Sequence, residues 1–196
     1  MLPLSTQERD FGSDRKSNVS ELRPFFLNTD RVGFSHWRED DLPLATTLWG
    51  DPKVSALIGG PFTSHQVKAR LSREIELMTV YAVQYWPVFL LQNNELAGCA
   101  GLRPYKHEER IFELGVHLRP EYWGQGLAQE AGRGIIAFAF ETLGVKGLFA
   151  GHHPANAASR RLIEKLGFRF THEELYPPTG LNHPSYLLTN PQHPAS

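Results

Sequence analysis

The stretch Glu121-Tyr122-Trp123-Gly124-Gln125-Gly126-Leu127-Ala128 lies between an apolar run and a segment with helical periodicity. Its two glycines and its alanine leave the backbone bare where that helix begins. A turn of this kind directs N–H groups outward at the positive end of the helix dipole, which suits a phosphate or pyrophosphate. Alone, a small-residue helix entry is more often a packing device than a ligand site, so the neighbouring segments carry the argument.

Two other phosphate-binding loops are excluded by single residues. A Rossmann fingerprint needs Gly or Ala three positions after Gly126, where Gln129 stands. That fingerprint also belongs to a βαβ unit, whereas the runs before this turn predict an antiparallel meander. A Walker loop needs Gly-Lys-Ser or Gly-Lys-Thr, and the sequence contains neither.

The apolar run before the turn alternates as a strand does, so its side chains divide between two faces. One face carries Phe112, Leu114, Val116 and Leu118, and the other carries Ile111, Glu113, Gly115 and His117. A carboxylate and an imidazole therefore share one face of the strand that leads into the candidate anion site. The alternative is that this second face is only partly solvated and carries no site.

A second polar pair stands at the start of a helix predicted over 156–166. Asn156 and Ser159 are three residues apart, so they lie on one helical face. Taken alone, they are explained as a helix cap and an ordinary first-turn residue. His152 and His153 are adjacent on an extended segment and point to opposite faces, so no metal site is expected there.

Periodicity along the whole chain predicts one domain of the α+β class, with helices packed on a mixed sheet. Strands are expected at 31–37, 87–91, 96–102, 111–118, 147–151, 169–176 and 185–188. Helices are expected at 38–48, 65–83, 124–142 and 156–166, with loops at 51–52, 59–61 and 177–184. Residues 1–24 are interpreted as an N-terminal extension, 25–189 as the domain and 190–196 as a C-terminal tail. A homodimer formed through the extension is a hypothesis without sequence support.

The composition excludes several classes of protein. Among 196 residues, 20 Lys and Arg face 21 Asp and Glu, and the resulting net charge of −1 argues against general nucleic-acid binding. The single cysteine, Cys99, rules out an intramolecular disulfide and is interpreted as a thiol inside a strand. No apolar stretch approaches the roughly 18 residues of a membrane span, and the N-terminus lacks a signal-peptide core. A cytoplasmic location without a membrane partner is the default expectation.

The strand with Glu113, the glycine turn and Asn156-x-x-Ser159 ahead of Leu166-Gly167-Phe168 together resemble the GNAT superfamily of acetyl-CoA-dependent N-acetyltransferases. The resemblance spans about residues 29–188 and is closest to the ribosomal-protein-alanine acetyltransferase branch. Trp123 stands where the superfamily often has Arg or Gln, as is usual in that branch. The resemblance implies a mostly antiparallel central sheet with helices on both faces.

The resemblance also implies where acetyl-CoA binds as co-substrate, without a metal. Backbone N–H groups from Gly124 to Ala128 would hold the pyrophosphate, and the pantetheine would run beside Val116 to Leu118, with an N–H near Leu118 polarising the thioester carbonyl. Asn156 would hold the pantetheine or a water. The implied cofactor-binding set is Val116, Leu118, Trp123, Gly124, Gln125, Gly126, Leu127, Ala128 and Asn156.

For catalysis the family match makes Glu113 the first choice of base, with His117 as the rival because its free pKa lies closer to neutrality. Ser159 would donate a proton to the departing thiolate. The acceptor is expected to be an amine, either a protein N-terminus or a small molecule. The runner-up function is a non-catalytic acyl-CoA-binding regulatory module. The candidate walls of the acceptor site are Trp37, Phe62, Trp86, His117 and the segment 176–186. The aromatic residues among them are more readily explained as core residues.

Overall fold

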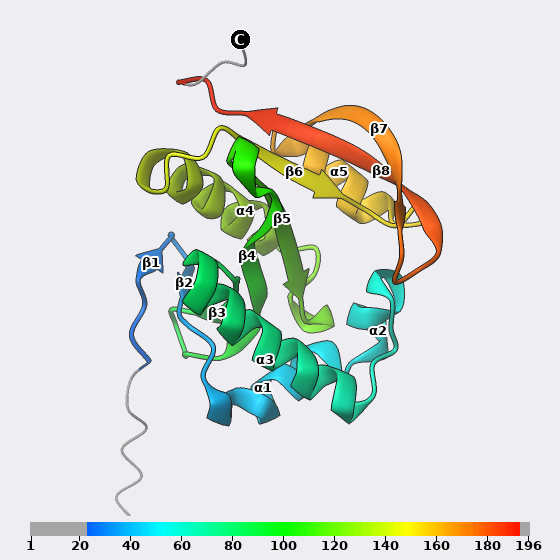
Figure 1. Cartoon of the computed structure of the whole chain (residues 1–196). Helices are drawn as coiled ribbons and strands as arrows, with labels where there is room; N and C mark the ends of the chain where they lie inside the picture. The colour runs from blue at the N-terminus through cyan, green and yellow to red at the C-terminus, as the bar shows by residue number, and fades with distance from the viewer. Residues whose placement is uncertain (1–22, 193–196) are drawn as a thin grey trace, which may run out of the picture.

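One eight-stranded sheet organises the computed structural model, which describes residues 23–192 (Figure 1). The strands lie in the order β1-β2-β3-β4-β5-β6-β8-β7, and every neighbouring pair is antiparallel except β5 and β6. The mixed, mostly antiparallel sheet is therefore confirmed. Residues 1–22 of the predicted extension and 193–196 of the predicted tail lie outside the described residues. The strands are β1 Leu27–Asn28, β2 Val32–Phe34, β3 Tyr85–Leu90, β4 Leu96–Lys106, β5 Ile111–Leu118, β6 Gly147–Gly151, β7 Arg169–Tyr176 and β8 Leu181–Thr189.

Helices cover both faces of the sheet, as expected. The helices are α1 Leu42–Trp49, α2 Pro52–Ser55, α3 Ser64–Tyr81, α4 Leu127–Ala137 and α5 Ala157–Lys165. Alternating strand residues feed two separate cores: Trp86 and Leu114 pack with α4 and α5, whereas Tyr85 and Cys99 pack with α1 to α3. The segment with helical periodicity after the glycine turn forms α4, and its apolar stripe of Leu127, Ala131 and Ile135, spaced four residues apart, is buried.

The parallel pair β5 and β6 separates soon after it forms, which opens the sheet. Pairing runs only from Ile111 to Glu113 on β5 and from Gly147 to Phe149 on β6. Beyond Glu113, β5 continues to Leu118 without pairing to β6. The sheet therefore presents an unpaired backbone edge next to the turn that leads into α4.

Backbone alternation shows which groups of β5 this open edge carries. The Arg119 N–H donates to the Ala97 carbonyl of β4 at 2.9 Å. Because hydrogen-bonded and non-bonded pairs alternate in an antiparallel ladder, the N–H groups of Val116 and Leu118 point away from β4 and toward the open edge. The Trp123 indole N–H donates to the Leu118 carbonyl at 2.8 Å, which occupies one acceptor there.

The helix predicted from Gly124 begins at Leu127, so its first boundary was wrong. Gly124 and Gly126 adopt left-handed φ angles of 73° and 78°, which the helix cannot include, and Gly126 is the N-cap residue. The periodic segment still ends at Thr142, because α4 continues into a π-helical turn over Phe138–Thr142.

Two predicted loops also contain regular structure. The loop expected over 177–184 is a tight hairpin, because β8 already begins at Leu181 and Gly180 turns the chain with φ 69°. The loop expected at 51–52 is instead the start of α2, where the Asp51 side chain accepts a hydrogen bond from the Lys53 N–H at 2.8 Å and caps the helix.

Candidate active site

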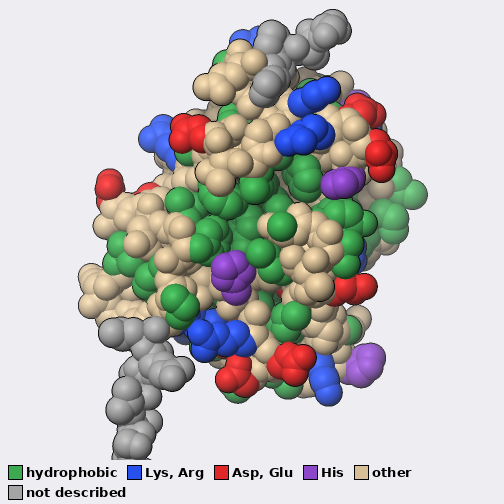
Figure 2. Space-filling view, turned by 60° about the vertical axis from the view of Figure 1, so that its left-hand side comes forward, with side chains coloured by type: hydrophobic (Ala, Val, Ile, Leu, Met, Phe, Trp, Pro, Cys, Tyr) green, Lys and Arg blue, Asp and Glu red, His purple; other side chains and the backbone are tan. Residues whose placement is uncertain are grey.

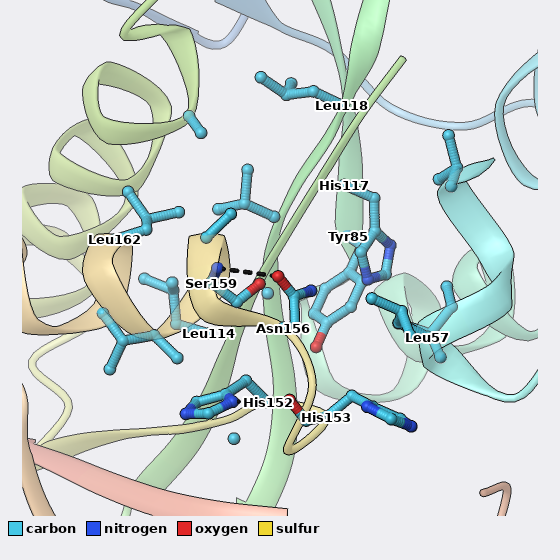
Figure 3. A pocket seen from close by; sticks show the side chains of 18 of the residues that line it. Leu57, Tyr85, Leu114, His117, Leu118, His152, His153, Asn156, Ser159 and Leu162 are labelled. Carbon is cyan, nitrogen blue, oxygen red and sulfur yellow. Dashed lines mark hydrogen bonds between the residues drawn. The ribbon is translucent and has the colours of Figure 1, made fainter. Parts of the chain in front are cut away.

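A cavity of about 490 Å³ lies where β5 and β6 diverge. It brings together the strand face, the glycine turn and the first turn of α5, which are far apart in the sequence. Figure 3 shows Asn156 and Ser159 on one side of it and His117 and Leu57 on the other. The predicted site residues that line it are Glu113, Val116, His117, Leu118, Trp123, Gly124, Gly126, Leu127, Ala128, Asn156 and Ser159. Gln125 is the predicted member that does not.

The glycine turn is open toward the cavity. A Cβ added at Gly124 would meet no atom within 4 Å, so the space above that residue is free. The first N–H groups of α4 have no acceptor within their own helix. Open space and free donors at a helix N-terminus fit the phosphates of a CoA thioester.

Arg31, in the turn between β1 and β2, fixes this loop and was missed by the sequence analysis. Its Nη1 donates to the Gln125 carbonyl at 3.0 Å, and its Nε pairs with the Glu130 carboxylate at 2.6 Å. The Gln125 side chain donates back to the Glu121 carbonyl at 2.7 Å, so it serves the loop. An exposed arginine 94 residues away in sequence carries no local signal of this contact.

Asn156 and Ser159 form the helix cap that the plainer interpretation predicts. The Asn156 Oδ1 accepts from the Ser159 N–H at 3.0 Å and satisfies a free donor of α5. Both side chains nevertheless line the cavity. The cap therefore fixes the position of a hydroxyl and an amide opposite the open edge of β5.

Glu113 and His117 are separated by a glycine for a packing reason. A Cβ at Gly115 would overlap the phenol ring of Tyr85, which lies against β5 between the two side chains. The Tyr85 and His117 ring centroids are 5.5 Å apart. This strand face is half-buried, in agreement with the partly solvated alternative, and Glu113, Gly115 and His117 on it line the cavity.

Burial raises the pKa of Glu113, while nearby Arg103 and Tyr85 act in the opposite direction. The carboxyl group thus needs a higher pH than an ordinary glutamate to lose its proton. Such a shift moves a carboxylate base toward the neutral range, where it accepts a proton more strongly.

His117 is held as a neutral acceptor. The Trp49 indole N–H donates to its Nδ1 at 3.4 Å, and since indole only donates, the imidazole proton lies on Nε2. Burial lowers the pKa of His117 well below its ordinary value, and Arg70 and Arg103 lower it further. Protonation of this ring would place a third cation in the same buried space.

A charged cluster behind these residues was not anticipated. Arg103, opposite Glu113 on β4, forms an ion pair with the fully buried Glu74 of α3. The Glu74 carboxylate also accepts from the Tyr85 N–H at 2.8 Å. Arg70, one helical turn before Glu74, lines the cavity and stacks over Trp49. In sequence, Arg70 and Glu74 form an i, i+4 pair typical of a solvated helix face.

The core interpretation is confirmed for three of the aromatic candidate walls. Trp37 and Trp86 are buried in the two cores, and Phe62 packs against the α1 to α3 core, so none of them lines the cavity. His117 does line it, together with Tyr176 of the predicted C-terminal segment.

Other expectations concern Cys99, the two adjacent histidines, metal binding and membrane spans. Cys99 is buried inside β4 as predicted, and burial raises its pKa to about 12. The Nδ1 of His152 lies 2.8 Å from the His153 carbonyl oxygen. Within residues 23–192 no group of three or more His, Cys, Asp or Glu side chains is arranged to hold a metal ion. No helix of the described part of the chain is long and apolar enough to cross a bilayer.

On one face of the molecule (Figure 2), charged side chains of both signs are mixed. On the face shown in Figure 2, apolar side chains occupy the centre, and charged side chains of both signs lie around them. Together with the net charge of −1, this means that an anionic ligand must be held by local donors.

Comparisons with known proteins agree with this geometry. A family model described as an acetyltransferase (GNAT) domain matches residues 31–169. The uncharacterized N-acetyltransferase p20 of Bacillus licheniformis is 25% identical over 145 residues, covering 73% of this chain and 82% of that protein.

Two solved structures share the fold. RimL, a ribosomal L7/L12 alpha-N-protein acetyltransferase in complex with coenzyme A, superposes with a TM-score of 0.73 at 13% identity, covering 85% of this chain and 98% of that one. The ribosomal-protein-S5-alanine acetyltransferase of Vibrio fischeri has a TM-score of 0.66 at 18% identity, covering 86% and 98%.

Proposed function

Because the chain belongs to the GNAT acetyltransferase family, we propose that it transfers the acetyl group of acetyl-CoA directly to a primary amine, either a protein N-terminal α-amine or a small-molecule amine. One observation carries the proposal. The unpaired edge of β5 meets the glycine turn at the cavity, and Glu113 projects into that cavity from the same strand.

Backbone groups bind the co-substrate in this proposal. The N–H groups around Gly124 to Ala128 hold the pyrophosphate, and those of Val116 and Leu118 pair with the pantetheine along the open edge. Acetyl-CoA, when bound, supplies an activated acetyl thioester. The Leu118 N–H is directed to the place where negative charge develops on the carbonyl oxygen. One such donor contributes on the order of 10²–10³ in rate.

Side chains move the protons. Glu113 accepts a proton from the acceptor ammonium, directly or through water, and its raised pKa suits that role. His117 is the weaker candidate, because its Nδ1 already accepts from Trp49 and its pKa is lowered. Ser159 holds a hydroxyl proton opposite the open edge, where a sulfur leaving group needs one.

Amine basicity favours an α-amine over a lysine side chain as acceptor. At pH 7, removing the proton costs about 1–1.4 kcal/mol for an α-amine and about 4.6 kcal/mol for lysine. A single carboxylate base suits the smaller cost. The names of RimL and the Vibrio fischeri structure, which specify ribosomal-protein acetylation, support a protein N-terminus of the ribosomal-protein-alanine branch.

A pair of substitutions tests this proposal. Gly126→Glu places a carboxylate at the anion site and should abolish acetyl-CoA binding in calorimetry. Gly180→Glu is the matched control, because Gly180 shares the left-handed φ, 69° against 78° at Gly126, and has open space for a side chain, but lies in the β7–β8 turn. Unchanged binding in the Gly126 variant, or loss in both, would overturn the assignment of the turn. Binding without turnover on any amine would instead favour the regulatory module.

A further inference from the structure

Arg70 lies at the wall of the cavity and has no anionic partner among residues 23–192. Arg70 lines the same cavity as Glu113, His117 and Tyr176, and its charge acts to lower the pKa of each. Within residues 23–192 no carboxylate lies within 4.0 Å of its guanidinium, whereas neighbouring Arg103 has Glu74 as its own partner.

The Arg70 side chain is held in place by aromatic rings, and the burial of its charge is energetically unfavourable. Its guanidinium carbon lies 4.9 Å from the ring centroid of Trp49 and 5.6 Å from that of Phe62, so two aromatic faces hold the side chain in place. Its Nε–H is buried and has no hydrogen-bond partner among the described residues. A half-buried charge without a partner is unfavourable, and an anion in the cavity would compensate it.

The surrounding charges do not supply that anion. Glu174 also lines the cavity, but its carboxylate accepts from the Tyr105 hydroxyl at 2.8 Å and pairs with His172 at 3.2 Å. Lys53 of α2 lines the cavity too and adds a second positive charge. Glu113 is a further carboxylate of the lining, but it lies more than 4.0 Å from the Arg70 guanidinium. The lining cations Lys53, Arg70 and Arg103 outnumber the lining carboxylates Glu113 and Glu174. This wall of the cavity therefore disfavours a polycation and favours a group of negative charge.

On the basis of the proposed function, we infer that Arg70 binds an anionic group of the acceptor, so that the acceptor class is an amine that also carries a carboxylate. The carboxylate can belong to a free amino acid or to an acidic side chain beside a peptide N-terminus. Both present an amine to Glu113 and a carboxylate to Arg70. Polyamines lack the anionic group and are poor acceptors.

The test measures binding, so it does not depend on turnover. Calorimetry on the CoA-loaded protein compares phenylalanine with phenylalaninamide, and the tripeptide amide Ala-Asp-Phe with Ala-Asn-Phe. We expect the carboxylate member of at least one pair to bind about 10- to 100-fold more tightly, as charged hydrogen bonds require. The pair that shows the preference identifies the source of the carboxylate.

Variants assign the preference to one side chain. Arg70→Gln should bring the ratio within each pair close to one, Arg70→Lys should keep part of it, and Lys68→Gln should keep all of it. Lys68 is the matched control because it is an exposed cation on the same helix. The ratio of the two affinities within a probe pair is compared between wild type and variants, so differences in amine basicity between the two probes cancel. Thermal unfolding of each variant checks that it is folded.

The outcomes separate this inference from the proposed function. An equal preference in wild type and in folded Arg70→Gln overturns the inference, and so does the absence of any preference in wild type. Either result leaves acetyl transfer intact if CoA thiol is released. A preference that Arg70→Gln removes supports the inference, and if no amine then releases thiol, it is the proposed function that fails.

Discussion

Replacing Glu113 by glutamine keeps the size of the side chain and removes its ability to accept a proton. The loss of a general base lowers turnover by about 10²–10⁴-fold, which corresponds to about 2.7–5.4 kcal/mol in the barrier. Glu113 shares its strand face with Gly115, against which Tyr85 of the α1 to α3 core packs, whereas the proposed acetyl-CoA contacts are backbone groups at the edge of β5. Glu113→Gln should therefore leave acetyl-CoA affinity unchanged.

The rates of wild type and Glu113→Gln should depend on pH in different ways. Because burial raises the pKa of Glu113, the wild-type rate should rise with pH through a value above that of an ordinary glutamate. In Glu113→Gln this rise of the rate with pH should be absent. The deficit of the variant should shrink as the pH passes the amine pKa of about 7.7–8.0, where free amine becomes available without a base.

His117→Gln is the matched comparison. Its imidazole is neutral and already accepts from Trp49, so we expect less than a tenfold loss of turnover. Thiol release is followed with a thiol reagent, and Cys99 adds little background because it is fully buried. Full activity in Glu113→Gln, or a larger loss in His117→Gln, would refute the assignment of the base.

Three further substitutions test separate parts of the site. Ser159→Ala should lower turnover by no more than about tenfold at pH 7, with less effect above the thiol pKa of about 8.5, and a pH-independent loss would contradict its role as acid. Arg31→Gln removes the contact to the Gln125 carbonyl and should weaken acetyl-CoA binding about tenfold in calorimetry, with an unchanged Kd counting against it. Glu74→Gln breaks the buried pair with Arg103 and should lower the free energy of unfolding in urea by about 3–5 kcal/mol, a prediction that a shift below 1 kcal/mol would refute.

Local patterns predicted most of the fold. Period-two alternation found β5 with its correct bounds, and the helical stripe found the buried face of α4 at Leu127, Ala131 and Ile135. The first residue of α4 was misplaced, because small residues fit both a helix and the left-handed turn that precedes it.

The parts of the site that escaped prediction depend on contacts between distant segments. Gly115 is required by the Tyr85 ring of β3, which becomes visible only when the strand register is known. Arg31 donates to the Gln125 carbonyl of the glycine turn, which is 94 residues away in the sequence. Arg70 and Glu74 point inward, although their spacing is typical of an exposed helix face. Trp37 and Trp86 were candidate walls because aromatic residues serve both cores and binding sites, and burial assigns them to the cores.

Direct acetyl transfer at the open edge of β5 is tested most directly by product stoichiometry. The protein is incubated with acetyl-CoA and a panel of N-terminal peptides and small amines, and both released thiol and acetylated amine are quantified. We predict that thiol release requires an amine and that each thiol is matched by one acetylated amine. Tight acetyl-CoA binding without acetylated product on any amine, or thiol release without that product, would contradict the proposal.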